Sequence, residues 1–321
     1  MLIPRFAHEV YVLTPEQVAH DHHGQPVNVW QTLSSSHNLK IFALFSLLTL
    51  ASLGSALFLK STKPFQKIGK LIDKATVFAP DLIRVAFGVS LLVSAKNHAV
   101  FGPELPLDIF PHAAVLKAVM VVTGIALTLG VFIRYFGLLA IGLWLFAAAN
   151  QGWYMLTYIN YLGEAIAVLL LSRQVFSLDF LIAKLRGVKL KSQKFEAYSM
   201  PAARILFGFS LLYAAINVKF VTSALSLDVV NRYHLSNYFP FDPLFIVFGA
   251  GMVECLIAGL YMLGLLQRLN SLLFIGFLTA SLLFFKESVW PHYLLIALAA
   301  GIFLHKPDRL ALDGRLFKSK K

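Results

Sequence analysis

The sequence predicts an all-α polytopic membrane protein with about nine transmembrane helices. The chain is 58% hydrophobic and only 14% charged, whereas a soluble domain is nearer half apolar and a quarter charged. Uncharged apolar runs recur along the chain, each long enough to cross the hydrocarbon core of a bilayer. Cations gather in the short segments between these runs, as they do in proteins that are oriented by cytoplasmic positive charge.

The same composition excludes several classes of function. The net charge of +12 is explained by membrane orientation, so we expect no nucleic-acid partner. Cys255 is the one cysteine, which leaves no disulfide framework, no CxxC pair and no thiolate metal cluster. The sequence also lacks HExxH, GxSxG and a Gly-rich phosphate loop, so it gives no support for a serine hydrolase or a nucleotide-driven transporter.

An internal repeat organises the membrane-spanning part. The stretch from Arg84 to Asn97 returns as Arg204 to Asn217, and eight of the fourteen positions are identical. Further matches, such as Gly130 with Gly264, extend the duplication beyond the first helix of each copy. Each copy has an even number of spans, so the first helices of the two copies cross the membrane in the same direction. We therefore expect the copies to be related by an axis along the membrane normal.

The chain divides as follows from its N-terminus. Residues 1–40 form an extracytoplasmic tail, and residues 41–79 contain the first span and a basic cytoplasmic loop. Residues 80–180 and 201–314 are the two four-helix copies, joined by a basic linker at 181–200 and followed by a basic tail at 315–321. The expected spans lie at about 41–59, 81–97, 113–133, 135–151, 158–173, 201–218, 243–266, 269–286 and 291–305.

With nine spans, all the cationic segments fall on one side of the membrane. This places the N-terminus outside and the C-terminus inside, as expected in the cytoplasmic membrane of a prokaryote. Four arginines lie near the cytoplasmic ends of the spans, and we expect their side chains to snorkel to lipid phosphate. They are Arg84, Arg134, Arg204 and Arg268.

Each copy resembles the DoxX-like family of small four-helix membrane proteins. The resemblance rests on an Arg-x-x-x-Gly first helix, a Gly-Leu-x-x-Arg end of the second, and a closing Leu-Asp. The second copy carries Glu254, Gly259, Gly264, Arg268, Pro307, Arg309, Leu312 and Asp313; the first carries Arg84, Gly88, Gly130, Arg134, Leu178 and Asp179. Met120 stands in the first copy where Glu254 stands in the second, so the copies are not chemically equivalent. Residues 1–79 lie outside the resemblance.

The resemblance to DoxX-like and DoxD-like proteins implies quinone-linked oxidation of sulfur compounds or a place in a membrane redox complex. No haem or flavin motif accompanies it, so we expect a partner redox protein or another membrane subunit to supply the electron carrier.

Polar groups in the outer half of the predicted bundle form the candidate ligand or proton site. Ionisable groups inside spans cost about 2.5–3.5 kcal/mol on insertion scales, so they are functional candidates by default. A quinone suits this region, because Lys, His or Asn donors can bind its carbonyl oxygens and a carboxylate can relay protons. The candidates are Glu254, Glu164, Asn217, Asn97, Lys96, His98 and His292.

Other interpretations stay open. Aromatic residues at span ends form ordinary interfacial belts, and polar side chains can satisfy one another between helices. His98 and His292 fit a haem only poorly. The tail histidines His20, His22 and His23 can bind a metal, although solvated surface histidines are commoner. The alternative function is a non-catalytic transporter or an assembly scaffold.

Overall fold

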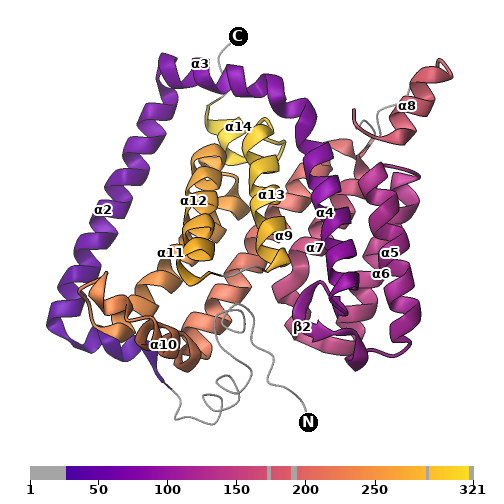
Figure 1. Ribbon diagram of the computed structural model, residues 1–321. Coiled ribbons are helices and arrows are strands. Elements are labelled where there is room, and N and C mark those ends of the chain that lie inside the picture. Colours follow the sequence, from indigo (N-terminus) through magenta and orange to yellow (C-terminus); the bar gives the residue numbers. More distant parts are fainter. Residues whose placement is uncertain (1–26, 172–174, 189–193, 287–288, 318–321) are drawn as a thin grey trace. The chain divides into compact units, whose positions relative to one another are not determined.

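The computed structural model describes residues 27–171, 175–188, 194–286 and 289–317, and these are almost entirely helical (Figure 1). Six helical stretches among them are long and apolar enough to cross a membrane: Ser36–Ser61, Lys63–Lys96, Ile133–Leu170, Glu196–Val221, Pro243–Leu263 and Gln267–Phe285. Two shorter apolar helices are Ala113–Leu129 and Trp290–Leu304. The chain is therefore a helical, multi-pass membrane protein, as its hydropathy predicts.

The smaller of two compact units consists of the described parts of Met1–Lys67 and Leu211–Gly259. Its core is aromatic: Trp30 stacks on Phe220 with ring centroids 5.2 Å apart and meets Phe248 edge-on. Asn38 is buried because its amide donates to the Thr32 carbonyl at 3.1 Å. The elements are η2 (Val29–Ser34), α2 (Ser36–Ser61), η7 (Ile216–Val221, π-helical), α10 (Ser223–Arg232), η8 (Leu235–Asn237) and most of α11 (Pro243–Leu263).

The larger unit consists of the described parts of Ile68–Ser210 and Leu260–Lys321. Helix α3 (Lys63–Ile72) crosses from one unit to the other, as does α9 (Ser199–Ala215). After η3 (Asp73–Phe78), the first copy contains α4 (Ala79–Lys96), β1 (Ala99–Val100), β2 (Gly102–Pro106), η4 (Leu107–Ile109), α5 (Ala113–Leu129), α6 (Ile133–Gln151), η5 (Gly152–Tyr158), α7 (Ile159–Leu170) and α8 (Leu178–Leu185). The rest are η6 (Glu196–Tyr198), α12 (Gln267–Phe285), α13 (Trp290–Leu304) and α14 (Leu312–Leu316).

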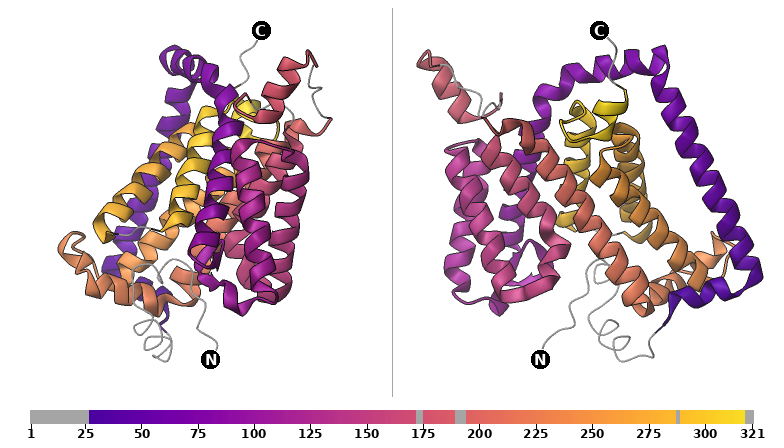
Figure 2. Two further views of the ribbon diagram at one scale, coloured as in Figure 1. Left: turned by 45° about the vertical axis from the view of Figure 1, so that its right-hand side comes forward. Right: turned by 180° about the vertical axis from the view of Figure 1, so that it is seen from behind.

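Close helix packing in the larger unit is made possible by glycine. Figure 2 shows α4, α5, α6 and α7 side by side, and α4 packs against both α5 and α13. A Cβ atom on Gly88 of α4 would lie 2.8 Å from the carbonyl oxygen of Gly124 in α5. The two backbones therefore approach as small-residue membrane helices do.

The stretch Ile133–Leu170 is a hairpin of two helices. Helices α6 and α7 pack against each other, and a Cβ atom on Gly137, near the start of α6, would lie 3.0 Å from the Leu169 nitrogen near the end of α7. The chain reverses at η5, where Gly152 has a φ of +63°. The separate helices predicted at 135–151 and 158–173 are thus both present.

A repeated aspartate closes the two copies in the same way. Asp179 accepts hydrogen bonds from the Phe132 and Ile133 nitrogens at 3.1 and 3.2 Å, at the start of α6. Asp313 accepts from the Leu266 and Gln267 nitrogens, both at 2.9 Å, at the start of α12. Each carboxylate satisfies amides that a helix start leaves without partners and complements the helix dipole.

Candidate functional site

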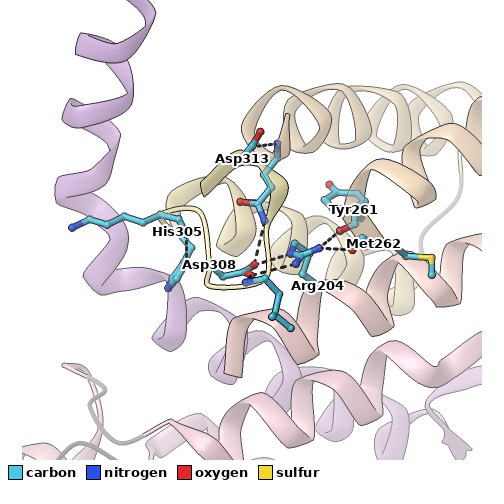
Figure 3. Close-up of polar contacts among 9 residues, drawn as sticks. Arg204, Tyr261, Met262, His305, Asp308 and Asp313 are labelled. Atoms are coloured by element: carbon cyan, nitrogen blue, oxygen red, sulfur yellow. Dashed lines mark hydrogen bonds and ion pairs between the residues drawn. The ribbon is translucent and has the colours of Figure 1, made fainter. Parts of the chain in front are cut away.

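Arg204 forms a buried cluster at one end of the larger unit (Figure 3). Its guanidinium donates to both carboxylate oxygens of Asp308, at 2.7 Å from Nε and 3.3 Å from Nη2. The Nη1 group also donates to the Tyr261 carbonyl and, at 2.8 Å, to the Met262 carbonyl. These carbonyls lie in the last turn of α11, where the Tyr261 carbonyl also accepts from the Gly264 nitrogen at 3.0 Å, so one side chain ties the first helix of the second copy to its second helix.

Arg84 repeats this arrangement in the first copy. Its Nη1 group donates to the carbonyls of Leu127 and Thr128 at the end of α5, the latter at 2.9 Å. Its Nη2 group bonds to Asp81 at 3.0 Å and to the Phe176 carbonyl at 3.1 Å. The carbonyl contacts are equivalent in the two copies, but the acid comes from the arginine's own helix in the first copy and from beyond α13 in the second. We call these two sets of contacts the arginine clasps.

The prediction that Arg84 and Arg204 snorkel to lipid phosphate is wrong. Their exposed fractions are 0% and 1%, and their charges are met by carboxylates and helix-end carbonyls within the protein. A buried guanidinium is tolerable only when it is paired and hydrogen-bonded in this way. The clasps therefore hold helix ends together, although Arg84 Nε and Asp81 Oδ2 of the first clasp have no hydrogen-bond partner among the described residues.

His305 lies at the edge of the second clasp, just beyond the end of α13. It is half-buried, and its Nδ1 group donates to the Lys306 carbonyl. Burial lowers the pKa of this imidazole below its ordinary value, because the charged form loses hydration. The hydrogen bond to the Lys306 carbonyl and the charge of Asp308 oppose this shift, while the charges of Lys306 and Arg268 add to it. His305 is therefore held in its neutral form.

A second buried polar group lies between α7 and α9. Ser210 donates to the Thr157 carbonyl and lies 3.2 Å from Asn160 Oδ1, and the Asn160 amide donates to Glu164 Oε1 at 3.3 Å. Close packing surrounds these contacts, since a Cβ atom on Gly163 would lie 3.1 Å from the Ala202 carbonyl oxygen. We call Asn160, Glu164 and Ser210 the α7–α9 polar junction.

Glu164 is the member of the junction whose burial costs the most free energy. Its exposed fraction is 0%, and its Oε2 atom has no hydrogen-bond partner among the residues that the structure describes. An ionised carboxylate that is buried with one oxygen lacking a partner is costly, so an ionisable group in this position is a functional candidate by default.

Helix α7 also forms hydrogen bonds with α4 and the segment that follows it, within the first copy. The Ser90 hydroxyl lies 2.8 Å from the Tyr161 hydroxyl, which in turn donates to the Phe101 carbonyl at 2.8 Å. Trp290 donates to the same carbonyl at 3.0 Å and to Ser94 at 2.8 Å. Ser90 and Ser210 are equivalent in the repeat, so each copy uses the same serine to bind α7.

The predicted residues at the end of α4 are exposed. Asn97 donates to the Val93 carbonyl of its own helix at 2.8 Å, and Asn217 does the same with the Tyr213 carbonyl at 2.9 Å. His98 Nε2 lies 3.2 Å from Lys117 Nζ, which places it beside a cation. The two repeated asparagines thus complete helix ends, and Lys96 next to Asn97 is exposed as well.

The remaining predicted residues differ in their surroundings. His292 is 4% exposed in the first turn of α13, two residues after Trp290. Glu254 is half-buried in α11 and has an interaction partner. Met120, which stands in its place in the first copy, is fully buried in the apolar core around α4 and α5. Glu164, Lys96, Asn97, His98 and His292 all belong to the larger unit, whereas Glu254 and Asn217 belong to the smaller one.

The proposed metal site at His20, His22 and His23 lies outside the described residues. Sequence reasoning found Glu164 but missed Asn160 and Ser210, its partners in the junction. The signal available for Ser210 was its identity with Ser90 in the repeat. Comparison of the chain with models of protein families, with characterised proteins and with solved structures finds no significant match.

Proposed function

We propose that this chain is a membrane subunit that serves a quinone-linked redox partner, with Glu164 as its proton-exchanging group. The observation that carries the proposal is the Oε2 atom of this fully buried carboxyl group, which has no hydrogen-bond partner in the described part of the chain. Reduction of a quinone takes up two electrons and two protons, and its oxidation releases them. A partner protein supplies or accepts the electrons, and Glu164 gives or takes a proton where water is excluded.

The α7–α9 polar junction supports this role by fixing the carboxyl group. The Asn160 amide holds Oε1, and Ser210 holds Asn160 in turn. Oε2 is then the one carboxyl oxygen in the junction from which a proton can move. The resemblance to DoxX-like proteins is a second support, because it implies quinone chemistry for residues 80–320.

The test is quinone-dependent turnover of the purified complex in nanodiscs. Glu164→Gln keeps the size and the hydrogen bond of the side chain but removes its proton, and we expect turnover to fall by about 100-fold, a common value for a lost acid–base group. Glu254→Gln is expected to impair turnover as well, because an ionisable group within a span is a functional candidate in its own right. Glu196→Gln, on the short helix before α9, is the matched control. Unchanged turnover in Glu164→Gln, or no quinone in lipid extracts of the purified complex, would refute the proposal.

A non-catalytic assembly scaffold or transporter is the alternative. The observation that favours a scaffold is the mutual saturation of Ser90, Tyr161, Trp290 and Ser94, which bond to one another and to the Phe101 carbonyl. Assembly of the partner complex with normal turnover in Glu164→Gln would favour the scaffold. Uptake of a solute into vesicles that contain the protein alone would favour the transporter.

We further propose a nine-span topology with the N-terminus outside, in the cytoplasmic membrane of a prokaryote. The distribution of cations supports it, because α8, α14 and the first turn of α6 carry basic residues at one end of the larger unit. The α6–α7 hairpin supplies two of these spans.

A further inference from the structure

Helix α3 has two exposed faces of opposite chemistry. Lys63, Lys67 and Lys70 follow one another at spacings of four and three residues, so they lie on one side of the helix, and all three are exposed. The other side carries Phe65 and Ile68, with Leu71 at its edge, and the exposed fractions of these three side chains are 50%, 53% and 64%. No acidic residue lies within Lys63–Ile72, so the polar face is purely cationic.

A third side of α3 is already bound by the protein. Arg268, at the start of α12, donates to the Gly69 carbonyl at 2.9 Å and pairs with Asp73 at 2.6 Å. A Cβ atom on Gly69 would lie 3.2 Å from Arg268 Nη1, which explains why this contact side carries no side chain. The side of α3 that contacts Arg268 is therefore distinct from both the lysine face and the apolar face.

Connectivity places α3 at the level where membrane spans end. Only Thr62 separates it from the last residue of the apolar helix α2, and the apolar helix α4 begins at Ala79. A helix in the plane of the bilayer surface buries its apolar side among the acyl chains and keeps its cations among the headgroups. A cationic face beside such an apolar face is complementary to a leaflet rich in anionic lipid.

We propose that α3 is an interfacial helix that binds the headgroups of anionic phospholipids through Lys63, Lys67 and Lys70. Phe65, Ile68 and Leu71 enter the boundary of the acyl chains beneath them, and the Arg268 contact fixes the rotation of the helix about its axis. The proposal concerns neither Glu164 nor quinone, so it stands or falls independently of the redox role.

Lipid selectivity gives the first test. The full chain is reconstituted in nanodiscs of mixed phosphatidylglycerol and phosphatidylcholine, and the lipids that stay bound after gentle delipidation are measured by mass spectrometry. Each lysine at an anionic surface contributes about 1 kcal/mol, so each Lys→Gln change should reduce the preference for phosphatidylglycerol by up to about fivefold. The variant is Lys63→Gln/Lys67→Gln/Lys70→Gln, and the matched control Lys63→Arg/Lys67→Arg/Lys70→Arg should keep the preference. An unchanged preference in the glutamine variant overturns the proposal.

The depth of the helix gives a test that does not depend on lipid counting. Nitroxide labels at positions 65 and 67, each introduced as a cysteine in a Cys255→Ser background, are exposed to oxygen and to a water-soluble nickel chelate. We expect the label at 65 to respond to oxygen and the label at 67 to the chelate. Equal response of both labels to the chelate would place α3 in water, and shielding of both from the two reagents would indicate a protein partner; either result refutes lipid binding.

Discussion

At the scale of single residues, the arginine clasps show how a charge is accommodated where water is scarce. Arg84 and Arg204 each meet one carboxylate and two carbonyls at the end of a neighbouring helix. The last carbonyls of a helix can accept further hydrogen bonds, although backbone amides already bond to the Leu127 and Tyr261 carbonyls. The cost of burying the arginine is offset by its carboxylate and by these helix-end carbonyls.

Removal of Arg204 alone should therefore be far more damaging than removal of the whole pair. Arg204→Met leaves Asp308 buried without its cation, and we expect a loss of about 3–5 kcal/mol in the free energy of unfolding. Arg204→Met/Asp308→Leu should recover much of that loss. Unfolding in mixed micelles with increasing denaturing detergent measures both variants. Arg134→Met is the control, because Arg134 is exposed and its loss should cost about 1 kcal/mol or less. A loss in Arg204→Met no larger than in the control would show that the clasp does not stabilise the fold.

His305 should give the stability of the protein a dependence on pH. Its pKa is lowered in the folded state by burial, so the unfolded chain binds the proton first as pH falls. The contribution of His305 is fully favourable above its unfolded pKa of about 6.5 and decreases as pH falls from there towards the lower folded pKa. Melting temperatures measured between about pH 8 and pH 5 test this. His305→Gln should flatten the acid limb of that profile, whereas His37→Gln at an exposed position should leave it unchanged.

At the scale of helices, the repeat identified the glycines and aspartates at helix ends, but it did not identify the acids that pair with Arg84 and Arg204. The positions of Gly130, Gly264, Asp179 and Asp313 were readable from the sequence, because a turn with positive φ followed by a helix start needs those residue types. The clasp acids were not readable. Asp81 lies three residues before Arg84, whereas Asp308 lies far along the chain from Arg204 and has no counterpart in the matching motif. Hydropathy identifies an arginine as charged, but it cannot predict which helix-end carbonyls will accept hydrogen bonds from it.

Gly264 should be among the least replaceable glycines of the second copy. Its φ is +65°, and a Cβ atom there would lie 2.7 Å from the Ala311 Cα. We expect Gly264→Ala to cost at least about 1–2 kcal/mol for the left-handed backbone, with the clash in addition. Gly276→Ala, in the middle of α12 with open space around it, should be neutral or stabilising by up to about 1 kcal/mol. Detergent unfolding of the two variants checks this, and equal losses would contradict the proposed need for glycine at 264.

At the scale of the whole molecule, composition was enough to predict a helical membrane protein, and the repeat was enough to place most helices within a few residues. The α7–α9 polar junction could not be predicted from the sequence. Ser210 and Asn160 belong to different copies, and only the fold brings them within 3.2 Å of each other. The candidate carboxyl groups lie at positions where the two copies differ. Glu164 lies in the first copy and Glu254 in the second, so a duplicated frame of clasps and caps supports carboxyl groups that are not themselves duplicated.

The topology of this frame can be tested through the α6–α7 hairpin. Trp153 is 81% exposed at the tip of the hairpin, and Lys184 is exposed in α8 beyond the end of α7. Since α7 separates the two positions and should cross the membrane, we expect them on opposite sides, with 153 outside and 184 inside. Single cysteines at these positions, in a Cys255→Ser background, are treated with a membrane-impermeant maleimide in intact cells and in inverted vesicles. Position 153 should react in intact cells and 184 only in inverted vesicles. Reaction of both from one side would mean that α7 does not cross the membrane, and the count of nine spans would then be wrong.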